Sequence, residues 1–145
     1  MGNLYETDFY AWTQAQADTL RRGEFQAADL SNLIEEIETM GRGEKRELIN
    51  RMVVLLTHLL KWQHQFLLRG NSWRRTINEQ RRQIEMVLEE SPSLAPSVPH
   101  VIARAYVDAV KAASDETGIK PGDFPGHCAY SQEQILTDFW FPDTE

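Results

Sequence analysis

Apolar side chains recur at spacings of three and four residues through most of the chain, and glycine and proline separate the runs. This period is typical of amphipathic helices, whose C-terminal ends glycine commonly marks. It predicts a single all-α domain over residues 1–145, a bundle of five to six helices joined by short loops. The expected helices cover about 7–22, 29–41, 43–68, 71–91 and 96–117, with a short one from Ser131 to about Phe139.

Two of these segments carry informative apolar faces. The segment 29–41 has a stripe of apolar side chains at spacings of three and four and is expected to end at Gly41; the stripe consists of Leu30, Leu33, Ile34 and Ile37. The segment 43–68 has apolar residues over a much wider face. A face of that width predicts a long central helix that is contacted from two sides.

The C-terminal region has a different pattern. An ordered loop is expected over 119–130, and Ser131 with Gln134 fits a capping box for the short last helix. The three aromatic residues 139–141 follow that helix. Because such a patch is unfavourable in water, we expect this aromatic tail to dock on the bundle or on a partner chain.

Composition and hydropathy indicate the class of protein and its location in the cell. The chain has 145 residues, 41% of them hydrophobic, and one cysteine, so a core is expected without disulfide bonds. The longest apolar run, 52–60, is too short to span a membrane. The first residues do not resemble a secretory signal. We therefore expect a cytoplasmic protein with no membrane partner.

The net charge of −7 is distributed in blocks. Residues 1–40 hold two basic and eight acidic side chains, residues 41–82 hold ten and three, and residues 83–145 hold three and eleven. The basic centre has two interpretations, a surface for an anionic partner or a set of helices that packs against acidic neighbours. We favour the second, because arginine-rich and glutamate-rich helices commonly lie together.

Catalytic and metal-binding patterns are weak. His127 and Cys128 are adjacent, which rarely lets a base reach a nucleophile. A metal site would need carboxylates near 35–38 to meet His58, but the Glu-x-x-His motif of helical di-metal sites is absent from the sequence. We expect no metal, no cofactor and no catalytic group, and we interpret residues 41–43 as a plain turn between helices.

The segment 61–82 combines cations with tryptophan, as single-stranded nucleic acid sites do. Helical geometry places Arg75 and Arg82 on the outer face, and Arg74 and Arg81 at the border of the core. The border arginines are suited to pairing with carboxylates of a neighbouring helix. The four arginines together are the alternative candidates for an anion or nucleic-acid surface.

Several blocks along the chain match a known pattern. They are Asp8-Phe9-Tyr10-x-Trp12, Leu33-Ile34-Glu35-Glu36-Ile37-Glu38, Leu55-Leu56-x-His58-Leu59-Leu60-Lys61-Trp62-Gln63, Ser72-Trp73-Arg74-x-Thr76-Ile77, Arg81-Arg82 and Glu89-Glu90-Ser91-Pro92-Ser93-Leu94. In this order they resemble the bacterial domain-of-unknown-function family twenty-nine. The resemblance implies a small all-helical bacterial protein, of a kind common in cyanobacteria and some proteobacteria, with no established activity.

The resemblance draws attention to residues that geometry places at the edges of apolar stripes. They form the predicted polar seam: Glu35, Glu38, His58, Trp62, Trp73 and Arg74. In that seam the carboxylates of 29–41 would face the third and fourth helices.

Three functions remain open on the sequence. We favour a non-catalytic interaction or assembly module, in its simplest form a homodimer. A nucleic-acid-associated protein that uses 61–82 is the alternative, opposed by the isoelectric point of about 5.1. A third possibility is an enzyme or small-ligand pocket around Glu35, His58, Trp62 and Arg74.

Overall fold

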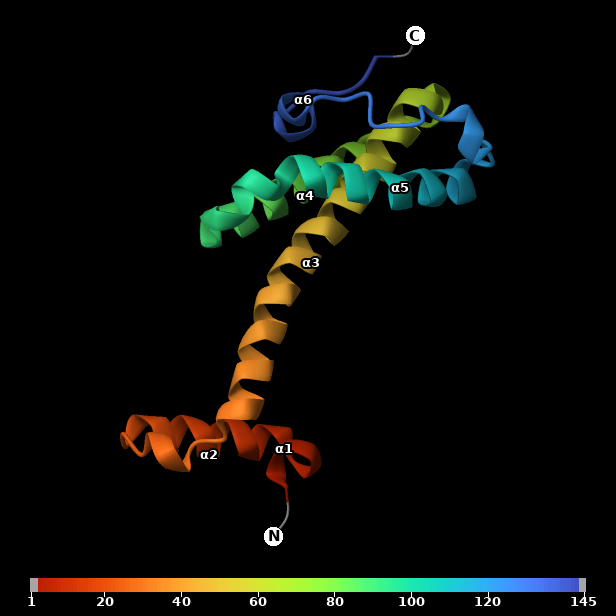
Figure 1. Cartoon of the computed structure of the whole chain (residues 1–145). Coiled ribbons are helices and arrows are strands. Elements are labelled where there is room, and N and C mark those ends of the chain that lie inside the picture. Colours follow the sequence, from red (N-terminus) through yellow and green to blue (C-terminus); the bar gives the residue numbers. More distant parts are fainter. Residues whose placement is uncertain (1–2, 144–145) are drawn as a thin grey trace. The chain divides into compact units, whose positions relative to one another are not determined.

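A computed structural model of the chain describes residues 3–143, and every regular element within them is helical. The predicted all-α class is confirmed. The α-helices are α1 (Leu4–Thr7), α2 (Phe9–Arg21), α3 (Leu30–His64), α4 (Asn71–Glu90), α5 (Val98–Thr117) and α6 (Gln132–Leu136) (Figure 1). Four 3₁₀ turns join them, η1 (Phe25–Ala27), η2 (Phe66–Leu68), η3 (Pro92–Ser97) and η4 (Pro121–Asp123).

Contacts divide the chain into two compact units. The N-terminal unit runs up to Arg42, and the C-terminal unit begins at Gly43. That the two units act as a single domain stays a prediction.

Local chemistry sets several helix ends. Asp8 caps α2 by accepting a hydrogen bond from the Ala11 backbone N–H at 3.0 Å. Gly118 ends α5 in the left-handed conformation, with φ of 79°. Ser131 and Gln134 form the predicted capping box of α6.

The predicted turn at 41–43 is wrong, because these residues lie inside α3. Neither Gly41 nor Gly43 has a positive φ. Each glycine costs about 1 kcal/mol in a helix interior. Good helix formers follow them at 44–48, and Arg42 pairs with Glu38 one turn before it. The helix runs through both glycines despite this cost.

The N-terminal unit is built around Trp12, its one buried hydrophobic residue within residues 3–42. The rings of Tyr5 and Phe9 pack on the Trp12 ring, with centroids 4.8 and 5.6 Å from it. The indole N–H of Trp12 donates to Asp29 at 3.1 Å, and the Tyr5 hydroxyl donates to Glu36 at 2.5 Å. Hydrogen bonds that these two aromatic side chains donate therefore join α1 and α2 to the start of α3.

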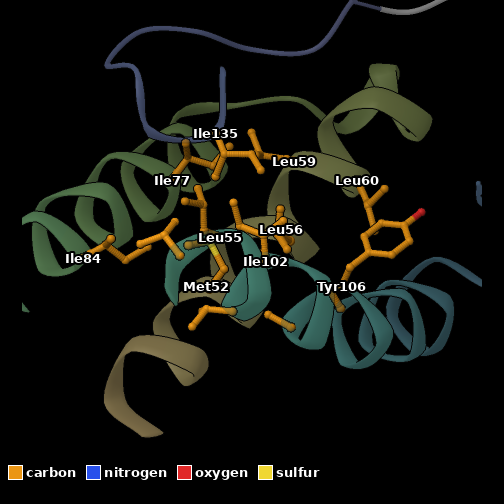
Figure 2. Close-up of a cluster of buried hydrophobic side chains, with 14 of the residues drawn as sticks. Met52, Leu55, Leu56, Leu59, Leu60, Ile77, Ile84, Ile102, Tyr106 and Ile135 are labelled. Carbon is orange, nitrogen blue, oxygen red and sulfur yellow. The ribbon is translucent and has the colours of Figure 1, made fainter. Parts of the chain in front are cut away.

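The core of the C-terminal unit forms where the second half of α3 packs against α4 and α5. Figure 2 shows Met52, Leu55 and Leu59 of α3 converging with Ile77 of α4 and Ile135 of α6. All of them are fully buried. The wide apolar face predicted for the central helix is confirmed.

The chain reverses direction at η3, so α4 and α5 run in opposite directions (Figure 1). Small residues lie on the buried face of α5, where Ala105, Ala109 and Ala113 are each 0% exposed. An alanine face lets neighbouring helices approach closely.

The aromatic C-terminal tail docks on the bundle, as predicted. The Phe141 ring packs on Trp62 with centroids 4.4 Å apart, and Trp140 meets Tyr130 edge-on at 5.5 Å. Phe139 departs from the prediction, because its side chain is 82% exposed. Its φ of 66° turns the backbone at this point.

Within residues 3–143, none of the helices combines the length with the apolar character that crossing a bilayer requires.

Candidate functional site

The members of the predicted polar seam belong to both units. Glu35 and Glu38 lie in the N-terminal unit, where both are exposed and face Arg42 at 3.6 and 3.7 Å. His58, Trp62, Trp73 and Arg74 lie in the C-terminal unit. A seam that joins the two groups stays a prediction.

His58 is engaged with its own helix. Its Nδ1 lies 2.9 Å from the Val54 carbonyl oxygen one turn earlier, which the Nδ1–H form can donate to. Burial lowers the pKa of His58 below its ordinary 6.5. The imidazole is therefore neutral near pH 7, and its hydrogen bond is to the backbone of its own helix rather than to a carboxylate.

Trp62 is the centre of a cation–aromatic cluster. Its ring is 7% exposed and is covered by Phe141 and by the guanidinium groups of Arg69 and Arg74, 5.2 and 5.5 Å from its centroid. Arg69 also donates from Nε to the Trp62 carbonyl oxygen at 2.7 Å, which satisfies a free carbonyl at the end of α3.

Trp73 has a similar arrangement with a single cation. The Lys61 ammonium lies 4.8 Å from the centroid of the Trp73 ring and pairs with Glu116 of α5 at 3.2 Å. The tryptophans of the predicted basic segment are therefore covered by cations of the same segment.

Sequence reasoning missed Arg69 and Phe141 as members of this cluster. Arg69 follows Trp62 by seven residues and lies one residue beyond the helix predicted over 43–68. The seven-residue spacing, which puts two side chains on one face wherever a helix continues, was the available signal. Phe141 comes from the tail, and no local pattern identifies the ring on which it packs.

Arg81 is buried, with only 3% of its surface exposed. The carboxylate partners predicted for it are absent from its hydrogen bonds. Instead, Nε donates to the Ile135 carbonyl oxygen at 2.8 Å and Nη2 donates to that of Trp140 at 2.8 Å. Its guanidinium holds α6 and the tail on α4, so it is not part of a surface for anions.

The other arginines of the anion candidate set are exposed. Arg74 donates to Asn71 at 3.0 Å, and Arg82 pairs with Glu79 at 2.9 Å, as its outer position predicted. Arg75 also lies on the exposed face. The four candidates thus divide into one structural and three accessible arginines.

Potential metal ligands are scattered. Within residues 3–143, His, Cys, Asp and Glu side chains do not gather in groups of three that could hold an ion.

A cavity of about 360 Å³ lies between α5 and the loop 126–132. Ile102, Tyr106 and Val107 form its apolar wall, and Cys128 lines it from the loop. Burial raises the pKa of the Cys128 thiol, which keeps it protonated and weakly nucleophilic near pH 7. The thiol therefore lacks the activation that a catalytic cysteine needs.

An apolar stripe is exposed on the N-terminal half of α3. We call it the α3 stripe: Leu30, Ile34, Ile37 and Met40, which are 57, 55, 62 and 64% exposed. The sequence predicted a core-facing surface here, from one of its clearest helical patterns. In the N-terminal unit this apolar surface faces solvent instead.

Comparison with known proteins places the chain in a family. Residues 4–141 match the model described as domain of unknown function DUF29, so the chain belongs to the DUF29 family. The resemblance identified from the sequence is confirmed. No curated protein and no solved structure matches the chain.

Proposed function

We propose that the protein is an assembly module that forms a homodimer through the α3 stripe. The observation that carries this proposal is the exposure of Ile34 and Ile37, two large aliphatic residues on consecutive turns of one helix. Contiguous exposed apolar surface of this kind marks interaction sites.

The size of the N-terminal unit supports a covering partner. Within residues 3–42 its buried hydrophobic core consists of Trp12 alone. Helical units of about 40 residues usually need a disulfide, a metal or oligomerisation to be stable. The sole cysteine of the chain is Cys128, so a disulfide within the N-terminal unit is excluded. Burying the α3 stripe in an interface would supply the missing core.

The spacing along α3 suits a second helix as the occupant. Leu30, Ile34, Ile37 and Gly41 alternate four- and three-residue steps, which is the seam of a coiled coil. A side chain built at Gly41 would meet nothing within 4 Å, so the backbone is open to close approach by another helix.

Charge complementarity supports a second copy rather than another protein. Glu35, Glu36 and Glu38 lie along the stripe, and residues 42–47 that follow carry a small excess of positive charge, with Arg42, Lys45 and Arg46 interspersed with Glu44 and Glu47. In an antiparallel, two-fold pairing, the acidic turns of one copy lie beside the basic turns of the other. The same surface is thus complementary to itself.

Analytical ultracentrifugation of the full chain over a wide concentration range tests the proposal. The wild-type chain is expected to dimerise, and Ile34→Glu with Ile37→Glu is expected to weaken dimerisation by about 100-fold or more, since central apolar contacts dominate interface energies. Thr39→Glu is the matched control, because it adds a carboxylate to the same helix at an exposed position on the face opposite the stripe.

Two outcomes would contradict this function. One is a wild-type chain that stays monomeric at all concentrations while its N-terminal amides remain protected from hydrogen exchange. The other is a dimer that the double glutamate variant leaves unchanged.

A further inference from the structure

A second exposed apolar surface lies in the C-terminal unit, at the turn between α3 and α4. Phe66, Leu67 and Leu68 form η2 and are 59, 86 and 63% exposed. Leu67 is the most exposed large apolar residue within residues 3–143. None of the three side chains is part of the hydrophobic core of this unit or of the partly buried residues that pack against that core.

Three arginines follow this turn, and the ion pairs found within residues 3–143 involve none of them. Arg69 ends η2, and Arg74 and Arg75 lie in the first turns of α4. Most other arginines of the described chain do form ion pairs, for example Arg51 with Glu47 and Arg104 with Asp108. The positive charge beside the apolar turn is therefore not neutralised by the fold.

The sequence around the turn carries no acid at all. Between Glu47 and Glu79 the chain contains no Asp or Glu, although acidic residues exceed basic ones by 22 to 15 overall. At physiological salt a charge is felt over about 8 Å, so the local cations matter more to a contacting surface than the net charge of −7.

We propose that residues 66–75, the basic-apolar turn, bind the surface of an anionic lipid bilayer. The side chains of Phe66, Leu67 and Leu68 would enter the boundary between headgroups and acyl chains, and Arg74 and Arg75 would pair with lipid phosphates. An apolar tip flanked by basic residues is the composition that interfacial binding requires. This proposal departs from the sequence-based expectation of no membrane partner.

The same residues do not suit nucleic acid. Stacking on bases needs open aromatic faces, but Trp62 is only 7% exposed and lies beneath Arg69, Arg74 and Phe141. In η2 itself Phe66 is the single ring, too few for a stacking platform, and Leu67 and Leu68 offer apolar bulk without a ring.

A protein partner is also a poorer fit. A stable protein interface buries about 800 Å² on each side, far more than a three-residue tip provides. Binding to a bilayer does not require so large a buried area, because insertion depends on a few apolar side chains and local charge.

Co-sedimentation of the full chain with vesicles tests the proposal. Vesicles of phosphatidylcholine alone are compared with vesicles that also contain phosphatidylglycerol, at low and at physiological salt. We expect binding to the anionic vesicles that weakens with salt. Leu67→Gln with Leu68→Gln should lower the partition coefficient about tenfold or more. Arg74→Gln with Arg75→Gln should lower it by a similar factor.

Phe139→Gln is the matched control, because Phe139 is an exposed aromatic residue outside the turn, and it should leave binding unchanged. Circular dichroism confirms that each variant is folded. The proposal is overturned if anionic vesicles do not bind the wild-type chain, if the double Leu→Gln variant binds equally well, or if single-stranded oligonucleotides bind through the same arginines and vesicles do not. These variants leave the α3 stripe intact, so the result is independent of dimerisation.

Discussion

Arg81 of α4 donates from Nε to the carbonyl oxygen of Ile135 in α6, 54 residues away in the sequence, at 2.8 Å. A guanidinium group is buried here to satisfy backbone carbonyls. The hydrogen bond holds the last helix on the bundle. It also explains why an arginine stands at the border of an otherwise apolar helix face.

Replacing Arg81 with methionine should lower the free energy of unfolding by about 2–4 kcal/mol, because charge-assisted hydrogen bonds to buried carbonyls are lost. Urea unfolding followed by tryptophan fluorescence measures the change. Arg82→Met is the control, since Arg82 is exposed and its pair with Glu79 is worth under 1 kcal/mol. Equal effects of the two substitutions would contradict the assigned role of Arg81.

Phe141→Ala should destabilise the C-terminal unit by about 1–3 kcal/mol, because the packing of this ring on Trp62 is removed. The emission of Trp62 should shift to the red as the indole gains contact with water. Phe139→Ala removes an equally large ring that is 82% exposed, and it should change neither stability nor emission.

Two glycine substitutions should have opposite signs. Gly43→Ala adds a methyl group inside α3 where nothing lies within 4 Å, and it should stabilise the helix by about 0.5–1 kcal/mol. Gly118→Ala forces a left-handed residue at φ of 79° and should cost about 1–2 kcal/mol. Thermal unfolding followed by circular dichroism compares them. If Gly43→Ala destabilises the protein, residues 41–43 are not helical in solution.

Acid should weaken the C-terminal unit through two histidines. Burial lowers the pKa of both His58 and His64 below 6.5. Below pH 6.5 the unfolded chain therefore binds protons that the folded chain does not. The free energy of unfolding is retained above pH 6.5 and falls as the pH drops towards the folded-state pKa.

Urea titrations between neutral and mildly acidic pH measure this dependence. His58→Gln with His64→Gln should flatten it. A steep acid dependence that survives in the double variant would assign the effect to other groups.

Local sequence signals predicted the elements that depend on local chemistry. Asp8, Gly118 and Ser131 each set a helix end through a backbone or capping preference, and the structure follows them. At Gly41 the same signal failed, because a glycine reports only its own conformational cost and not the helix formers that follow it.

The side-chain partners were less predictable. Helical spacing placed Arg81 at the edge of the core correctly, but the carbonyls it binds come from a segment more than 50 residues later. Phe141 and Trp62 meet for the same reason, through the path of the tail. Periodicity identifies a face of a helix and not the group that covers it.

The placement of tryptophan gives each unit its own optical reporter. Trp12 is the single tryptophan before Gly43, and the other three, at 62, 73 and 140, follow it. When Trp12 is replaced by phenylalanine, tryptophan fluorescence reports the unfolding of the C-terminal unit alone. When the other three are replaced instead, it reports the unfolding of the N-terminal unit alone. If the second copy stabilises only the N-terminal unit, mass action makes the Trp12 transition depend on protein concentration, whereas the transition of the other three does not.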